Sequence, residues 1–222
     1  MPPRIIVWLT VYAMAMANVE AVVVVYLRSI YYPDNPLVIF PLSLLSERDL
    51  LIEIVRELAT LVMISGVAAL AARSLVMAFA AFVYVFGVWD IFYYAWLKLM
   101  IGWPVAWLEW DLLFLIPWPW LGPWITAALI ALLFAAWGCW ALTGPNAVRF
   151  PRGASIVFAA GALLVLASFL APAVPLLRGG EVAFQSFRPG GFLWAFFIPG
   201  YLLMVVGLSW VVRISRAARV VG

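Results

Sequence analysis

Six long apolar stretches are the feature that most limits how this chain can fold. Each has about the 20 residues that an α-helix needs to cross the hydrocarbon core of a bilayer. They lie at about residues 5–27, 50–72, 75–100, 123–143, 154–176 and 192–213. The breaks between them are rich in proline, glycine and charge, as in GWP at 102–104 and GPN at 144–146. We therefore predict an all-α membrane protein with about six transmembrane helices.

The overall composition agrees with this class. Hydrophobic residues make up 68% of the chain and charged residues only 10%, whereas a soluble domain has about 25% charged residues. A soluble domain of this length could not bury so much apolar surface, so lipid must be the solvent. We predict a single polytopic domain over residues 1–222. Its charged part covers 1–122, and the last three helices, within 123–222, form an acid-free scaffold.

Two residue types that often bind cofactors are absent or scarce. Histidine is absent, which excludes imidazole ligation of haem or chlorophyll and histidine-type zinc sites. The single Cys139 can form neither an internal disulfide nor a thiolate cluster. We therefore predict no redox cofactor. The net charge of +3 is small and indicates no nucleic-acid partner, so the expected partners are the lipid bilayer and, as a further class, other membrane subunits.

The distribution of arginine predicts the orientation. With six spans, both termini share one side with the breaks near residues 73 and 150, and that side carries no acidic residue. Its basic residues are Arg4, Arg73, Arg149, Arg152, Arg213, Arg216 and Arg219. Basic residues close to the ends of spans mark the cytoplasmic face. We expect a multi-pass protein of the cell (inner) membrane with cytoplasmic N- and C-termini.

Charged residues enter the first three helices at one depth, in the outer half of the membrane. An isolated charge facing lipid costs at least about 2.5–3.5 kcal/mol, so we expect these side chains to turn toward one another. The candidate buried site consists of Glu20, Arg28, Glu53, Arg56, Glu57, Asp90, Tyr94 and Lys98. Arg56 follows Glu53 by three residues, and the last three residues of the set follow one another at intervals of four, the spacings of neighbours on a helix face.

The predicted site contains four acids and three bases, so one acid lacks a partner. That acid must be protonated, pair with another group or bind a hard cation such as Ca²⁺, Mg²⁺ or Na⁺. A structural alternative remains for individual residues, because Arg28 and Lys98 lie near helix ends and can extend to the interface. For Glu20 and Asp90, structural pairing and a functional role are equally compatible with the sequence.

The segment WPVAWLEWDLLFLIPWPWLGPW at 103–124 is the second unusual region. Its apolar run between prolines is too short to span a bilayer, and it carries Glu109 and Asp111. We predict a tryptophan- and proline-rich interfacial or re-entrant segment between the third and fourth helices. An aromatic belt at the membrane surface explains the tryptophans. The alternatives are a lid over the charged site, formed with Glu109 and Asp111, or a surface that docks another subunit.

Three segments of the first half share a resemblance. EAVVVVYLRSIYYP at 20–33, RELATLVM at 56–63, and GVWDIFYYAWLK, GWP and WDLLFLIPWPWLGP within 87–123 resemble a family of bacterial integral membrane proteins that has no assigned activity. The resemblance implies that the charged site and the tryptophan-rich segment belong to one functional unit. It implies no substrate and no catalytic residue.

Three function classes remain open. The first is a non-catalytic subunit or assembly partner of a membrane complex, favoured by the absence of redox ligands and by apolar, proline-stiffened outer loops. The second is a membrane-embedded enzyme acting on a lipid or outer-leaflet substrate, with Asp90 or Glu57 as general acid or base and a basic residue holding an anionic head group. The third is a channel or transporter in which the surplus carboxylate takes a proton or cation. Enzyme activity is therefore undecided at this level.

Overall fold

The computed structural model of the protein describes residues 1–31, 46–144, 148–176 and 190–220. Six helices in these ranges are long and apolar enough to cross a membrane, which confirms the predicted all-α, multi-pass fold. They are α1 (Pro3–Tyr31), α2 (Glu47–Ala71), α3 (Leu75–Ile101), α4 (Trp124–Thr143), α5 (Arg152–Leu170) and α7 (Trp194–Val220). A short 3₁₀ helix, η2 (Ala171–Ala173), follows α5.

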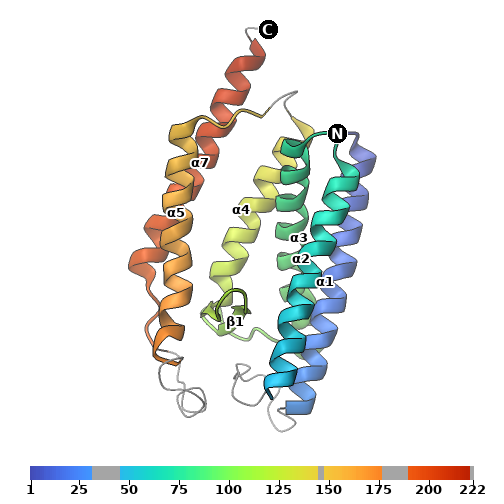
Figure 1. Ribbon diagram of the computed structural model, residues 1–222, viewed down its shortest axis with the longest axis vertical. Coiled ribbons are helices and arrows are strands. Elements are labelled where there is room, and N and C mark those ends of the chain that lie inside the picture. Colours follow the sequence, from blue (N-terminus) through green and yellow to red (C-terminus); the bar gives the residue numbers. More distant parts are fainter. Residues whose placement is uncertain (32–45, 145–147, 177–189, 221–222) are drawn as a thin grey trace.

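The helices pack in two groups. α3 lies at the centre of the first group and packs against α1, α2 and α4, while α5 and α7 pack against each other as the second group. Figure 1 shows the second group beside the first, with α4 next to it. α1 begins and α7 ends at the same end of the bundle, as six spans require. The packing therefore divides after α4, whereas the predicted division at residues 122 and 123 lies before α4.

Glycine allows close approach within each group. A Cβ atom on Gly87 of α3 would lie 2.4 Å from the carbonyl oxygen of Ala131 on α4. Likewise, a Cβ atom on Gly161 of α5 would lie 2.5 Å from the carbonyl oxygen of Gly200 on α7. Side chains at these positions would push the helices apart, so small residues set the spacing of both pairs, as is common between membrane helices.

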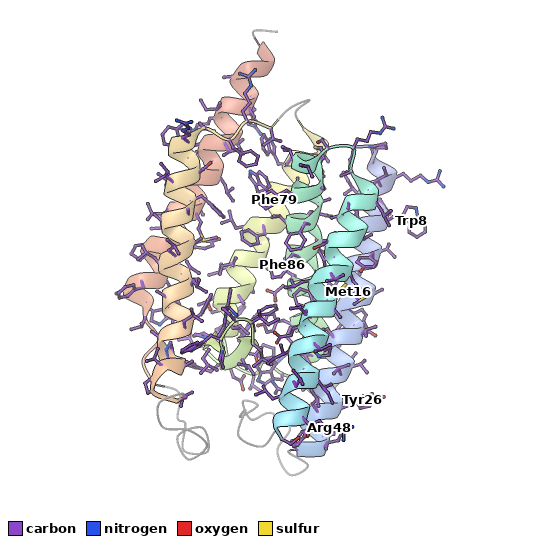
Figure 2. The ribbon with its side chains drawn as sticks, in the orientation of Figure 1. Trp8, Met16, Tyr26, Arg48, Phe79 and Phe86 are labelled. Carbon is purple, nitrogen blue, oxygen red and sulfur yellow. The ribbon has the colours of Figure 1, made fainter. Side chains whose placement is uncertain are left out.

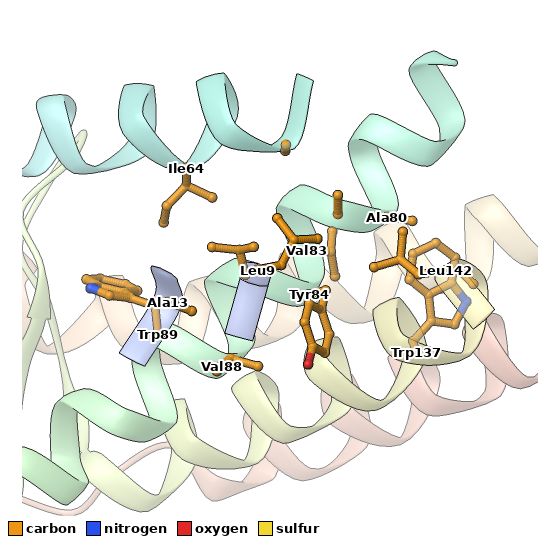
Figure 3. Packing of buried hydrophobic residues seen from close by; sticks show 14 of the residues in the cluster. Leu9, Ala13, Ile64, Ala80, Val83, Tyr84, Val88, Trp89, Trp137 and Leu142 are labelled. Atoms are coloured by element: carbon orange, nitrogen blue, oxygen red, sulfur yellow. The ribbon is translucent and has the colours of Figure 1, made fainter. Parts of the chain in front are cut away.

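The main apolar cluster lies inside the first group. Figure 3 shows side chains from α1 to α4 that meet there, among them Leu9, Ile64, Val83 and Trp137. Outside the bundle the surface is also apolar: Trp8 and Tyr26 point away from it (Figure 2) and are 63% and 64% exposed. An apolar outer surface on long helices is the pattern expected where lipid replaces water.

A β-hairpin connects α3 to α4. Its strands are β1 (Trp110–Phe114) and β2 (Trp120–Pro123), paired antiparallel with Leu112 opposite Leu121. The sequence predicted an interfacial or re-entrant segment here, but it did not predict strands. Trp110 and Leu121 belong to a buried apolar cluster that includes Phe169 of α5. The hairpin thus fills the space between the two helix groups at the end opposite the termini (Figure 1), and it brings Asp111 into the protein.

Candidate functional site

A charged cavity of about 80 Å³ lies where α1, α2, α3 and β1 meet. This volume has room for a few water molecules or a small polar group. Its polar lining consists of Glu20, Arg28, Glu53, Arg56, Glu57, Thr60, Asp90, Tyr93, Tyr94 and Asp111. The cavity therefore collects seven of the eight residues that the sequence assigned to a buried charged site, together with Asp111 from the tryptophan-rich segment.

Arg56 connects the acids of α1 and α2. Its Nη1 forms a hydrogen-bonded ion pair with Glu20 Oε1 on the neighbouring helix. Its Nε and Nη2 both lie 2.8 Å from Glu53 Oε2, one turn earlier on α2. Both donor edges of the guanidinium are occupied, so Arg56 is committed to these two carboxylates.

Glu57 joins α2 to the hairpin. Its Oε2 accepts a hydrogen bond of 2.9 Å from the backbone N–H of Leu115, just after β1. Both groups are buried, and the Glu57 residue is only 8% exposed. A buried N–H without an acceptor would cost about 1–3 kcal/mol, so this bond favours the docked hairpin.

Asp111 occupies the hairpin wall of the cavity. Its Oδ2 accepts a hydrogen bond of 3.3 Å from the Tyr94 hydroxyl, and its Oδ1 lies 3.8 Å from Arg28 Nη2. The Arg28 guanidinium also stands 4.3 Å from the centre of the Trp103 ring, in a cation–π contact. Burial raises the pKa of Asp111 to about 6, although Arg28 and the Tyr94 hydrogen bond oppose the rise.

Asp90 differs from the other acids of the cavity. Its carboxyl group lines the cavity, yet within the described ranges no hydrogen bond or ion pair reaches it. Asp111 is close enough to repel it electrostatically. Asp90 is therefore the carboxyl group with the greatest capacity to interact with a bound molecule.

Two predicted residues lie outside the cavity. Lys98 was expected to face the acids, but its Nζ donates to the carbonyl oxygens of Gly102 at 2.9 Å and Pro104 at 2.8 Å. This corrects the expectation: lysine at a helix C-terminus reaches carbonyl groups that have no partner within the helix. Glu109, the other expected lid residue, accepts hydrogen bonds from the backbone N–H groups of Val105 and Ala106 and thus orders its own turn.

The sequence did not indicate Thr60 and Tyr93. Thr60 Oγ1 lies 3.5 Å from Glu20 Oε2, and Tyr93 is a wall of the cavity next to Tyr94. Thr60 could have been found, because it continues the polar stripe of α2 one turn beyond Arg56. Tyr93 carried no such signal, since a tyrosine in an aromatic run is commonly a packing residue.

The balance of charge differs from the expected one. Five carboxyl groups and two guanidinium groups surround the cavity: Glu20, Glu53, Glu57, Asp90 and Asp111 against Arg28 and Arg56. Within the described part of the chain, no three acidic, histidine or cysteine side chains come together in a way that could hold a metal ion. The hard cation that the sequence left open thus has no preformed carboxylate cluster there.

No protein-family model, curated protein or solved structure matches the chain.

Proposed function

We propose that the protein is a membrane-embedded binding protein whose charged cavity holds a small positively charged group. The observation that carries the proposal is the excess of carboxyl groups over guanidinium groups around one cavity. The positively charged group would be an ammonium group, because the cavity offers separated carboxyl and aromatic groups rather than a compact set of metal ligands.

The electrostatics favour a cation over an anion. Two unit charges 4 Å apart interact by about 4 kcal/mol at an effective dielectric constant of 20. An ammonium group among the five carboxyl groups would therefore be attracted more strongly than it is repelled by the two guanidinium groups. An anionic head group would find Arg56 already paired with Glu20 and Glu53, and Arg28 beside Asp111.

The orientation belongs to the same proposal. The arginine-rich end, where α1 begins and α7 ends, would face the cytoplasm, and the charged cavity would lie in the outer half of the cell membrane. The ligand would then reach the cavity from the outer side or from the outer leaflet. This arrangement suits a binding protein, alone or as a subunit of a larger membrane complex.

The proposal is tested by calorimetric titration of the purified protein with butylamine hydrochloride, using butanol as the uncharged control. We expect saturable binding of the amine and none of the alcohol. Asp90→Asn should weaken amine binding at least tenfold. Asp49→Asn should leave binding unchanged, because Asp49 lies in the first turn of α2 and accepts hydrogen bonds from the Tyr31 and Ser46 hydroxyls outside the cavity.

Two outcomes would contradict the proposal. If the wild-type protein does not bind the amine, the charged residues only hold the helices together, and the role of a non-catalytic complex subunit is favoured instead. Equal binding by wild type and Asp90→Asn would place the amine outside the cavity.

A further inference from the structure

A second cavity adjoins the charged one. It measures about 250 Å³ and lies between α3, α4, α5 and the hairpin. The two cavities share the wall residues Trp89, Asp90, Leu113 and Phe114. The remainder of the second cavity is apolar, with Ile130, Ala131 and Phe169 among its lining residues. Asp90 therefore stands at the boundary between a charged and an apolar compartment.

A third cavity continues along the same side of α3 and α4. It measures about 560 Å³ and is lined by apolar side chains such as Phe79, Phe82, Phe158 and Leu208. Phe79 lines the third cavity and Phe86 the second, and Figure 2 shows both on the side of α3 that faces α5. Phe134 lines the third cavity, and its ring lies 6.4 Å from that of Phe86, so this pair separates the two apolar spaces.

The order of these compartments matches one kind of molecule. An apolar cavity of this size without contents would forfeit the packing contacts of its lining, and in a bilayer the molecules at hand to fill it are hydrocarbon chains. A chain lying in the second cavity brings whatever group is attached to its end next to Asp90. The excess of carboxyl groups there favours a positively charged group.

We infer that the ligand of this site is a long-chain amine. Its ammonium group lies among Asp90, Asp111 and the tyrosines, and its hydrocarbon chain lies in the second cavity and points toward the Phe86–Phe134 pair. The inference rests on the proposed function, since it assigns a tail to the ammonium ligand proposed above. Ordinary bilayer lipids with a phosphate beside the amine are disfavoured, because the phosphate would meet the surplus carboxyl groups.

The inference can be tested with a dodecylamine probe that carries a diazirine in its alkyl chain, added to the full-length protein in lipid nanodiscs. After photolysis, we expect labelled peptides from the facing sides of α3, α4 and α5 near Phe86 and Phe134. Unlabelled dodecylamine should compete for this labelling, whereas dodecanol, which has the same chain and no charge, should not.

A matched pair of variants sharpens the test. Ala127→Phe places a ring in the second cavity, and Ala136→Phe makes the same change on the exposed side of the same helix. We expect Ala127→Phe to lower the labelling at least tenfold and Ala136→Phe to leave it unchanged. Butylamine binding by Ala127→Phe should persist, which shows that the variant is folded and that its charged cavity is intact.

The experiments distinguish failure of the long-chain amine inference from failure of the proposed ammonium-binding function. If butylamine binds through Asp90 but labelling falls only on lipid-facing surfaces, or is unchanged in Ala127→Phe, the tail lies elsewhere and the inference is wrong. If no amine of any length binds in an Asp90-dependent manner, the proposed function itself is wrong.

Discussion

The carboxylate of Glu57, on the spanning helix α2, accepts a 2.9 Å hydrogen bond from the backbone N–H of Leu115, 58 residues further along the chain. This bond ties the hairpin to the helix bundle at the point where Asp111 enters the charged cavity. The shape of the cavity thus depends on a contact between a side chain and a distant stretch of backbone.

A substitution of Glu57 should weaken the attachment of the hairpin only if it removes the hydrogen-bond acceptor for the Leu115 N–H. Glu57→Gln retains an amide oxygen at similar volume, so we expect thermal stability close to that of the wild type. Glu57→Leu leaves the Leu115 N–H unsatisfied, at a cost of about 1–3 kcal/mol. Hydrogen exchange of the Leu115 amide should be at least tenfold faster in Glu57→Leu than in Glu57→Gln. Equal exchange in both variants would show that other contacts hold the hairpin.

The Glu20–Arg56 pair should show energetic coupling across α1 and α2. Glu20→Gln or Arg56→Met alone leaves the remaining partner less compensated, and the double variant removes the part of that penalty that arises from the Glu20–Arg56 contact. The loss of the Arg56–Glu53 contact is common to Arg56→Met and the double variant, so it cancels in the cycle. We expect a coupling energy of about 1–3 kcal/mol in a double-mutant cycle measured by unfolding in detergent.

The Asp90–Lys98 pair is the control for this cycle. Lys98 bonds to backbone carbonyl groups instead of Asp90, so the effects of Asp90→Asn and Lys98→Met should add within about 0.5 kcal/mol. Strong coupling between these two residues would mean that the Lys98 ammonium group leaves the carbonyl groups and turns toward Asp90.

Asp111 should make stability depend on pH in a defined direction. Its pKa in the folded protein is about 6, above the ordinary value of 3.8, so the native state binds the proton more tightly than the unfolded state does. Its stabilising effect is complete below about pH 4 and is lost as the pH rises through about 6. Since one pKa unit corresponds to about 1.4 kcal/mol, the loss is on the order of 3 kcal/mol.

The measurement is the difference in unfolding free energy between wild type and Asp111→Asn. As the pH rises from about 4 to 6, the unfolding free energy of the wild type should fall relative to that of Asp111→Asn. Above about pH 6 the difference between the two should stay constant. Glu109→Gln, just before β1 and outside the cavity, should not reproduce the shift. A difference independent of pH would mean that Asp111 is not desolvated.

Gly87 should be intolerant of any side chain. An alanine Cβ there would lie 2.4 Å from the Ala131 carbonyl oxygen and 2.6 Å from the Ala135 nitrogen, so α3 and α4 would have to separate. Overpacking of this kind costs about 1–3 kcal/mol, which should appear as a lower unfolding temperature in detergent. Gly66→Ala is the matched control, because no atom lies within 4 Å of its added Cβ. Alanine also has the higher helix propensity, so Gly66→Ala should not lower the unfolding temperature, and similar losses in both variants would contradict close packing at Gly87 as the cause.

Cysteine labelling tests the orientation with two serines of equivalent structural role. Ser46 caps α2 and Ser74 caps α3, and both are exposed at opposite ends of the bundle. In a Cys139→Ser background, an impermeant thiol reagent applied to intact cells should label Ser46→Cys and not Ser74→Cys. The reverse pattern would invert the orientation, and labelling of both would contradict six spans.

The sequence by itself determined the helices. A bilayer offers no hydrogen-bond partners to the backbone, so each apolar stretch of sufficient length must form a helix that satisfies its own N–H and C=O groups. The predicted stretch at 75–100 accordingly agrees with α3 at Leu75–Ile101. The same cost of exposing charge to lipid also indicated that Glu20, Arg56 and Asp90 should face inward.

Only the tertiary structure decided how those charges are partnered. The Asp90–Lys98 spacing permits a contact, but the nearer carbonyl groups at the end of α3 bind Lys98 instead. Asp111 enters the cavity because β1 pairs with β2 and Glu57 binds Leu115, and these contacts join residues far apart in the sequence. Helix formation depends on local periodicity and the solvent, whereas ion pairs depend on the rotation of each helix and on loop closure, which no local pattern specifies.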